Sequence, residues 1–269
     1  MAEVIANDGV RLCYQEAGSG QPLLVVPGLA GTASMFSHQL EGLRDRYRVI
    51  VYDHRGHGES DKPQHGYRVA RLAKDLDDLL ETLGLDGVTL MGWSMGCSVV
   101  WSYYDLFGPK RLARLILVEG HACLCRTPDM SERDAADAGA LFDPAEAAEL
   151  AGSLYHDQQA VVRRFAALFG TDAGTDAAWL AGEMLKLPGA AAAALMFDHS
   201  FNDWRDVIPR ITLPTLIVGG GRSHIPISSQ QWLHRTIRGS QLAVLPDRGH
   251  LPFHEEPRIF NQLVARFIG

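Results

Sequence analysis

The sequence has no long apolar run and few cysteines. None of its hydrophobic stretches approaches the ~20 residues that a membrane-spanning helix needs. The N-terminus, Met1-Ala2-Glu3-Val4, lacks the basic and apolar regions of a signal peptide, so we expect a cytoplasmic protein without a membrane partner. Four cysteines are too few for a disulfide scaffold, and the Cys123-Leu124-Cys125 spacing is too short for the usual zinc pair. We expect them to be reduced and structural.

Basic residues are also in short supply. Lys and Arg together number 25 against 32 Asp and Glu, which gives a formal net charge of -7 and a pI near 5.9. No Lys/Arg stripe offsets this acidic balance, so a nucleic-acid partner is not expected. The run Gly219-Gly220-Gly221 lacks the lysine and spacing of a phosphate loop. A small organic substrate, with no cofactor and no metal, fits this composition better.

The sequence does contain short apolar runs that alternate with longer amphipathic segments. Several of the runs lack polar alternation, which is typical of strands buried on both faces. Leucines recur at three- and four-residue spacing in 69–80 and predict a helix there. Val10 to Glu16 is expected to form an antiparallel edge strand before these. The pattern predicts an α/β fold with a mostly parallel sheet of about eight strands flanked by helices. The expected strands are 23–26, 48–52, 88–91, 115–118, 215–218 and 242–245.

The alternation stops after Val118, and the next expected strand begins only at Thr215. The residues between are rich in alanine and other helix formers, for example in 144–150 and 189–196. We therefore expect a helical cap inserted after the sixth strand. Ligands in open α/β sheets bind at the carboxyl ends of the strands, where such a cap would lie. The predicted division is a core of residues 1–120 and 206–269 and a cap of residues 121–205.

The pentapeptide Gly92-Trp93-Ser94-Met95-Gly96 lies between an expected strand and a helix-compatible stretch. In such a tight turn, side chains two residues before and after the serine would collide with neighbouring backbone, so both places favour glycine. The turn exposes the Ser94 hydroxyl and directs the Met95 amide, at the helix N-terminus, toward an oxyanion. This context favours a nucleophilic serine over a chance match.

A serine nucleophile needs a base within hydrogen-bond reach. Of the eleven histidines, His250 is the best candidate because it lies in the loop that leaves the last expected strand. His254, four residues later, is expected at the start of the terminal helix. His54 and His57 have a spacing that could suggest a metal site, but without further ligands we interpret their segment as a solvated turn.

The second oxyanion donor is expected in the loop Pro27-Gly28-Leu29-Ala30-Gly31, which follows the strand 23–26. Glycine lets the backbone turn back over the site, and the Leu29 amide is the expected donor beside Met95. Taken alone, Pro-Gly is an ordinary turn.

Together these motifs resemble those of the α/β-hydrolases. The resemblance covers nearly the whole chain, from Pro27-Gly28-Leu29 through the segment 53–60 and the Ser94 turn to Gly249-His250. It implies the α/β-hydrolase fold and a triad of serine, acid and histidine. Many members have His-Gly where this chain has Pro27-Gly28, a change that keeps the backbone amide.

The chain departs from the family's pattern at the triad acid. The family usually places an aspartate in the loop after the strand that precedes the histidine strand. That loop, 219–226, contains no acid here, and none occurs between Asp206 and Asp247. Ser223 takes the aspartate's usual place. A neutral hydroxyl could orient an imidazole, but it would not stabilise an imidazolium electrostatically.

Glu119 is the predicted acid. It ends the strand 115–118, next along the chain after the nucleophile strand, and therefore emerges at the same edge of the sheet. The order Ser94, Glu119, His250 keeps the sequence nucleophile, acid, base. Some family members, including lactonases that open the zearalenone macrocycle, are similar in carrying a glutamate acid after this strand. Asp247 is the fallback.

The predicted function is a cofactor-independent serine hydrolase that cleaves a carboxylic ester or lactone. Carbon-carbon bond hydrolase and perhydrolase reactions use the same turn and stay open. Epoxide hydrolases and haloalkane dehalogenases are disfavoured because those relatives attack with an aspartate where this chain has Ser94. A ligand sensor with little turnover is the alternative from another class, and the missing aspartate motivates it.

The substrate pocket is less defined. Residues expected in the cap could form an apolar pocket or pack the cap on the core, and two histidines could approach it without an assigned role. The apolar candidates are Met196, Phe197, Phe201 and Trp204, and the histidines are His121 and His199.

Overall fold

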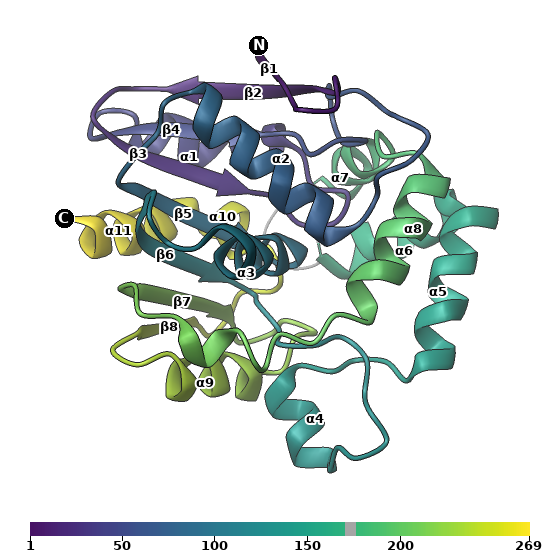
Figure 1. The fold of residues 1–269 in the computed structure, drawn as a ribbon. Helices are drawn as coiled ribbons and strands as arrows, with labels where there is room; N and C mark the ends of the chain where they lie inside the picture. The colour runs from purple at the N-terminus through teal and green to yellow at the C-terminus, as the bar shows by residue number, and fades with distance from the viewer. Residues whose placement is uncertain (170–175) are drawn as a thin grey trace.

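The computed structural model describes residues 1–169 and 176–269 and contains one eight-stranded sheet (Figure 1). The strand order is β1-β2-β4-β3-β5-β6-β7-β8, with β1, β2 and β4 paired antiparallel and every other pair parallel. The predicted fold class is confirmed. The strands are β1 (Ala2–Ile5), β2 (Arg11–Ala17), β3 (Gln21–Val26), β4 (Tyr47–Tyr52), β5 (Val88–Trp93), β6 (Leu112–Val118), β7 (Thr215–Gly220) and β8 (Gln241–Leu245).

Helices cover both faces of this sheet. The helices α2 (Val69–Thr82) and α3 (Met95–Phe107) pack together on one face, while α1 (Ser37–Leu43) and α11 (Pro257–Ile268) pack together on the other (Figure 1). Every residue of β5 and β7 is buried between these layers. Because no residue of these strands faces water, they read in the sequence as apolar runs without alternation.

The expected edge strand is not at the edge. β1 pairs outside β2, with Glu3 opposite Cys13, so the segment that begins at Val10 forms the second strand of the sheet. β1 has four residues, and only Val4 is buried. One buried side chain gives no hydrophobic periodicity, so the sequence pattern does not predict this strand.

Between β6 and β7 the chain forms helices, as the alanine-rich segments predicted. Figure 1 places most of these helices beyond the carboxyl ends of the parallel strands, while the first of them packs against α9 (Ile227–Thr236). The exact division between core and cap stays a prediction. The inserted helices are α4 (Glu132–Ala138), α5 (Pro144–His156), α6 (Gln158–Phe169), α7 (Ala177–Met184) and α8 (Gly189–Ser200).

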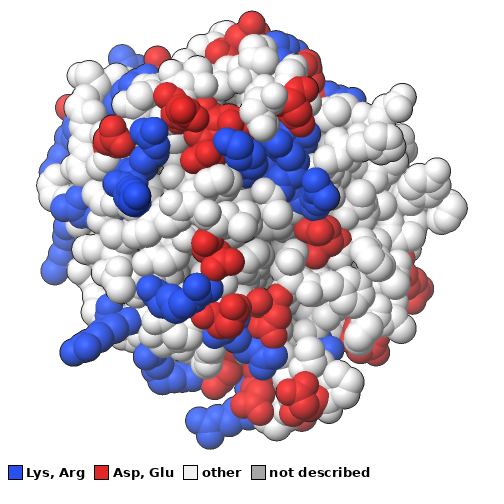
Figure 2. All heavy atoms as spheres, viewed as in Figure 1, with Lys and Arg blue, Asp and Glu red and all other residues white. Residues whose placement is uncertain are grey.

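Acidic and basic side chains are interspersed on the face shown in Figure 2, and no basic stripe crosses it. Within the described residues, no single helix is both long and apolar enough to cross a membrane. Only α7 and α8 taken together, across a bend of 87°, reach that length and apolarity.

One buried ion-pair cluster joins the loop after β4 to helix α2. Asp75 is fully buried and accepts hydrogen bonds from Arg55 Nε at 2.6 Å and from Arg71 Nη2 at 2.6 Å. Arg55 is itself 2% exposed. Removing one partner from such a pair leaves an uncompensated buried charge, which is far more costly than losing an exposed pair.

We therefore expect Asp75→Ala to lower the free energy of unfolding by about 3–5 kcal/mol. Asp77→Ala is the matched control on the same helix. Asp77 pairs with Lys74 at 2.8 Å but is partly exposed, so its loss should cost about 0–1 kcal/mol. Urea unfolding of both variants measures the difference, and equal losses would contradict the importance of the buried cluster.

Candidate active site

Ser94 lies in the turn between β5 and α3, as predicted. Its backbone has φ 54° and ψ −122°, and its N–H donates to the Val118 carbonyl at 2.9 Å. A Cβ at Gly92 would come within 2.8 Å of the Gly96 carbonyl oxygen, and a Cβ at Gly96 would collide with the Val26 carbonyl. Both glycines are therefore required by close backbone packing around the serine.

Three non-glycine residues with positive φ occur in the described chain: Ala30 at 57°, Ser94 at 54° and Glu119 at 56°. Each one directly follows or closely follows the carboxyl end of a parallel strand. Such conformations cost energy, and they persist only where the surrounding structure enforces them. Their concentration at one edge of the sheet makes this edge the candidate functional site.

Glu119 and His250 meet at this edge, beneath the surface. Glu119 follows β6, His250 lies in the loop after β8, and their exposed fractions are 1% and 3%. His250 Nδ1 is 3.0 Å from Glu119 Oε2. A proton on Nδ1 makes this a hydrogen bond to the carboxylate and leaves Nε2 as the basic nitrogen.

Two further groups hydrogen-bond to the Glu119 carboxylate. The Gly220 N–H donates to Oε1 at 2.6 Å, and the Ser223 hydroxyl donates to Oε2. Ser223 Oγ is also 3.5 Å from His250 Nδ1. Ser223 therefore lies at the position where the family usually has an aspartate. In this chain its hydroxyl donates a hydrogen bond to Glu119, which follows the neighbouring strand β6.

Burial shifts the pKa values of both members of this pair. It raises the pKa of Glu119 to about 8, against the opposing effect of the Ser223 and Gly220 hydrogen bonds. It lowers the pKa of His250 to about 3. Both shifts have the same cause, because a low-dielectric site disfavours either charged form. His250 is therefore neutral at pH 7, and the hydrogen bonds to Glu119 favour its ionised form.

Neighbouring residues contact both the backbone and the ring of His250. Trp93 Nε1 donates to the His250 carbonyl at 2.9 Å, and the Phe169 and His224 rings lie at centroid distances of 4.8 and 4.4 Å from the imidazole. Ser94 and His250 line the same cavity without a direct hydrogen bond between them. Catalytic hydrogen bonds often tighten only when substrate binds. No motif in the sequence indicates a role for His224 or Phe169.

The two amides expected to bind an oxyanion also border the cavity, since both Leu29 and Met95 line it. The positive φ of Ala30 and the hydrogen bond from the Gly31 N–H to the Gly28 carbonyl, at 3.0 Å, turn the Leu29 loop back toward Ser94. A Cβ at Gly28 would come within 3.1 Å of the Ser94 Cβ, so the loop lies directly against the serine.

His54 and His57 are not in a solvated turn, and that interpretation was wrong. Both are fully buried, and burial lowers their pKa values to about 3 and about 4. His54 Nε2 is 3.0 Å from the Pro27 carbonyl. The adjacent Asp53 accepts from the Ala33 N–H at 2.7 Å. This segment therefore anchors both ends of the loop that contains Leu29.

The alternative base and acid lie away from the cavity. His254 is on α10 (Pro252–Glu255), where its ring stacks on Trp179 at 5.4 Å. The Asp247 side chain is 75% exposed and lies 3.6 Å from Arg222. Neither lines the cavity with Ser94, whereas His250 does.

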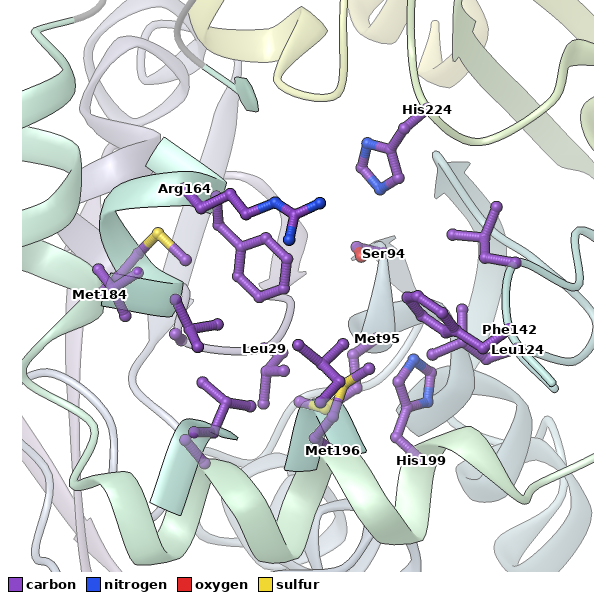
Figure 3. A pocket seen from close by; sticks show the side chains of 18 of the residues that line it. Leu29, Ser94, Met95, Leu124, Phe142, Arg164, Met184, Met196, His199 and His224 are labelled. Atoms are coloured by element: carbon purple, nitrogen blue, oxygen red, sulfur yellow. The ribbon is translucent and has the colours of Figure 1, made fainter. Parts of the chain in front are cut away.

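The cavity has a volume of about 570 Å³ and lies between the strand ends and the inserted helices (Figure 3). Its walls are mainly apolar. Met196, His121 and His199 line it, while Phe197 and Phe201 are exposed and Trp204 packs near Trp101. Met196 is thus the one apolar candidate that reaches the cavity.

His121 and His199 form a buried pair, with their Nε2 atoms 3.1 Å apart. Burial lowers the pKa values of both, so the pair is neutral at pH 7. These two rings place polar nitrogen atoms in an otherwise apolar part of the wall.

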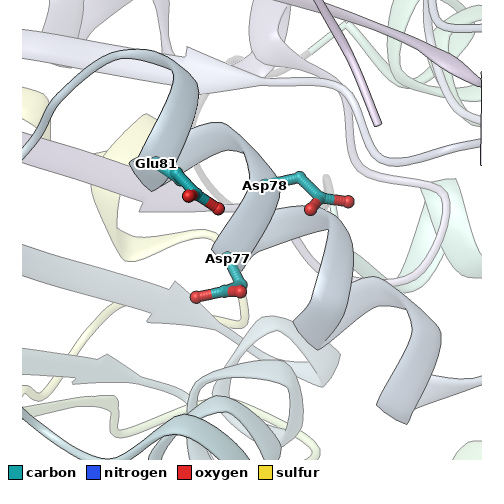
Figure 4. Close-up of side chains that lie close together, drawn as sticks. All are labelled: Asp77, Asp78 and Glu81. Atoms are coloured by element: carbon teal, nitrogen blue, oxygen red, sulfur yellow. The ribbon is translucent and has the colours of Figure 1, made fainter. Parts of the chain in front are cut away.

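One group of acids has the proximity that a metal site requires, among the described residues. Asp77, Asp78 and Glu81 each place one ligand atom within 4.8 Å of the others on α2 (Figure 4). The Lys74 ammonium already lies 2.8 Å from a carboxylate oxygen of both Asp77 and Asp78. The three acids do not line the cavity, and we assign them no metal.

Comparison with known proteins agrees with this fold. A putative non-heme chloroperoxidase from Synechocystis sp. is 31% identical, over 96% of this chain and 95% of its own. The 3-oxoadipate enol-lactonase 2 of Acinetobacter baylyi is 27% identical, over 97% and 94%. The structure of an esterase from Exiguobacterium antarcticum superposes with a TM-score of 0.91 at 26% identity and covers 100% of this chain and 99% of its own.

These similarities support a hydrolase that acts on a small molecule. The family described as alpha/beta hydrolase fold matches residues 21–257, which is most of the chain. The protein therefore belongs to the alpha/beta hydrolase fold family.

Proposed function

We propose that this protein is a cofactor-independent serine hydrolase that cleaves carboxylic esters or lactones through an acyl-enzyme. Ser94 is the nucleophile, His250 the general base and Glu119 the acid that orients and stabilises the imidazole. The 3.0 Å contact between His250 Nδ1 and Glu119 Oε2 carries the proposal, because it gives the histidine the tautomer that a serine nucleophile needs.

In the first step, His250 Nε2 takes the Ser94 proton as Oγ attacks the substrate carbonyl. The backbone N–H groups of Leu29 and Met95 donate to the oxyanion, and Met95 adds the favourable end of the α3 dipole. The imidazolium returns the proton to the leaving oxygen. His250 then deprotonates a water that attacks the acyl-enzyme, which releases the acid and regenerates Ser94.

Glu119 is suited to its role by its surroundings rather than by an intrinsically low pKa. Its carboxylate is almost completely buried and is not paired with Lys or Arg among the described residues. When His250 becomes protonated, the new positive charge forms 3.0 Å from Oε2, in a region of low dielectric. An ion pair between His250 and Glu119 therefore forms at the stage of the reaction where positive charge develops on the imidazole.

Ser94→Ala should abolish turnover of short aryl esters while leaving the fold intact. The variant should also fail to react with a fluorophosphonate, which should modify the wild-type protein once, at Ser94, because a base-activated serine attacks the phosphorus. Intact-mass measurement and circular dichroism check both points. A wild-type protein that stays unmodified would support a ligand sensor instead.

Glu119→Gln should lower kcat by about 10³- to 10⁴-fold, the order of loss seen when a serine protease triad loses its acid. Asp247→Asn is the control and should keep nearly full activity. Adding Ser223→Asp to the Glu119→Gln variant should restore part of the activity, since Ser223 Oγ is 3.5 Å from His250 Nδ1. Nearly full turnover in Glu119→Gln alone would show that another group is the acid.

The pH dependence follows from the raised pKa of Glu119, about 8. The active form needs Glu119 ionised, so kcat/KM should rise with pH through this value and fall as pH drops below it. His250, with its pKa lowered to about 3, stays neutral over this range. Ser223→Ala removes a hydrogen bond that lowers the pKa of Glu119 and should move the midpoint of the acid limb to higher pH.

The pH–rate profile of Ser228→Ala provides the control for Ser223→Ala. Ser228 donates to the Ala136 carbonyl at 3.0 Å and does not contact the triad, so its profile should match the wild type. A shift of the Ser223→Ala midpoint to lower pH, or no shift, would contradict the role given to Ser223.

A further inference from the structure

Arg164 differs from the other residues that line the cavity. It belongs to α6, and in Figure 3 its guanidinium points from that helix into the cavity, on the side where Ser94 and His224 lie. It is the only Lys or Arg among the described lining residues. The apolar side chains around it, such as Phe165 and Val161, offer it no counter-charge.

The acids of the same cavity do not neutralise Arg164. Glu146 and Glu149, both on α5, line the cavity, and no ion pair joins either of them to Arg164 in the described part of the chain. The Glu146 carboxylate already has a partner, because it accepts a hydrogen bond from the Asp143 N–H at 2.9 Å in the capping box of α5. Arg164 therefore has five N–H donors that are available to a ligand.

The histidines of the cavity do not provide a competing positive charge. Burial lowers the pKa values of His121, His224 and His250 to about 3, and that of His199 is also lowered. Arg164 is thus the permanent cation of this wall. Among the described residues, Arg164 makes no hydrogen bond or ion pair with Glu119 or His250, so replacing it removes no contact of the triad.

We propose that Arg164 binds a carboxylate of the substrate, and that the enzyme acts on esters or lactones whose acyl part carries a second, free carboxylate. This inference rests on the proposed serine hydrolase function and narrows its substrate class. A guanidinium pairs with a carboxylate through two parallel N–H···O bonds, which fix direction as well as distance. The substrate would then be held at two points, with the anion at Arg164 and the scissile carbonyl at Ser94.

Matched pairs of esters test this proposal. For each straight-chain dicarboxylic acid from succinate to suberate, the monoethyl ester carries the free carboxylate and the diethyl ester does not. We expect the wild type to prefer the monoester of at least one chain length. Arg164→Gln should raise KM for that monoester roughly tenfold and change KM for the diester less than about twofold, because only the anion loses its partner.

Arg163→Gln is the matched control. Arg163 is on the same helix, carries the same charge and is exposed, as Arg164 is, but it does not line the cavity, so its loss should not alter the preference. Glu149→Gln should lower KM for the monoester, since it removes a like charge from the cavity. The preference for the monoester should also weaken as ionic strength rises.

Calorimetric binding of the free dicarboxylates to wild type and Arg164→Gln separates this proposal from the serine hydrolase function. Arg164-dependent binding without hydrolysis of any ester would contradict the hydrolase function and leave the carboxylate site standing. Equal KM values for monoester and diester at every chain length, or equal effects of Arg163→Gln and Arg164→Gln, would overturn the role of Arg164.

Discussion

The hydrogen bond between His250 Nδ1 and Glu119 Oε2 is the interaction on which the rest of the site depends. It joins the ends of two strands that are not neighbours, because β7 lies between β6 and β8. The Glu119 carboxylate spans that gap by accepting from Gly220, at the end of β7, with its other oxygen. One side chain therefore ties three consecutive strand ends together, and its full burial is possible because these donors replace water.

Such a connection requires the backbones at the strand ends to approach closely. A Cβ at Gly220 would collide with the Gly249 carbonyl, just before His250. The positive φ of Glu119 turns its side chain back toward β7 and β8, while its N–H still donates to the Val218 carbonyl at 2.9 Å. The backbone strain at Glu119 is thus compensated by the sheet hydrogen bond and by the contacts of its carboxylate.

The sequence predicted those features that depend on short stretches of chain. The apolar runs gave the parallel strands, and the Gly92 to Gly96 spacing gave the turn at Ser94. The absence of acids between 206 and 247 led to Glu119, whose carboxylate the structure places against His250. The strand and turn predictions succeeded because local sequence fixes strand burial and turn geometry directly. The role of Glu119 as the acid stays a prediction.

Features that depend on long-range packing could not be predicted in the same way. His54 and His57 follow a strand in a glycine-rich segment that has the composition of a surface turn, yet they are buried beneath the Leu29 loop. His224 meets His250 only because the loops after β7 and β8 lie side by side. No local pattern encodes such a contact, and only an assembled sheet reveals it.

The residues assigned to the reaction and the residues that form the cavity walls come from different parts of the chain. This difference explains why the first group could be predicted from the sequence and the second could not. The groups that we assign to the chemistry at Ser94 come from strand-end loops of the sheet, whose geometry the fold constrains. The walls come largely from α5, α6 and α8, which are inserted between β6 and β7 and are not constrained by strand pairing. A single charged position on such a helix, as at Arg164, can therefore set the class of substrate while the strand ends keep the reaction unchanged.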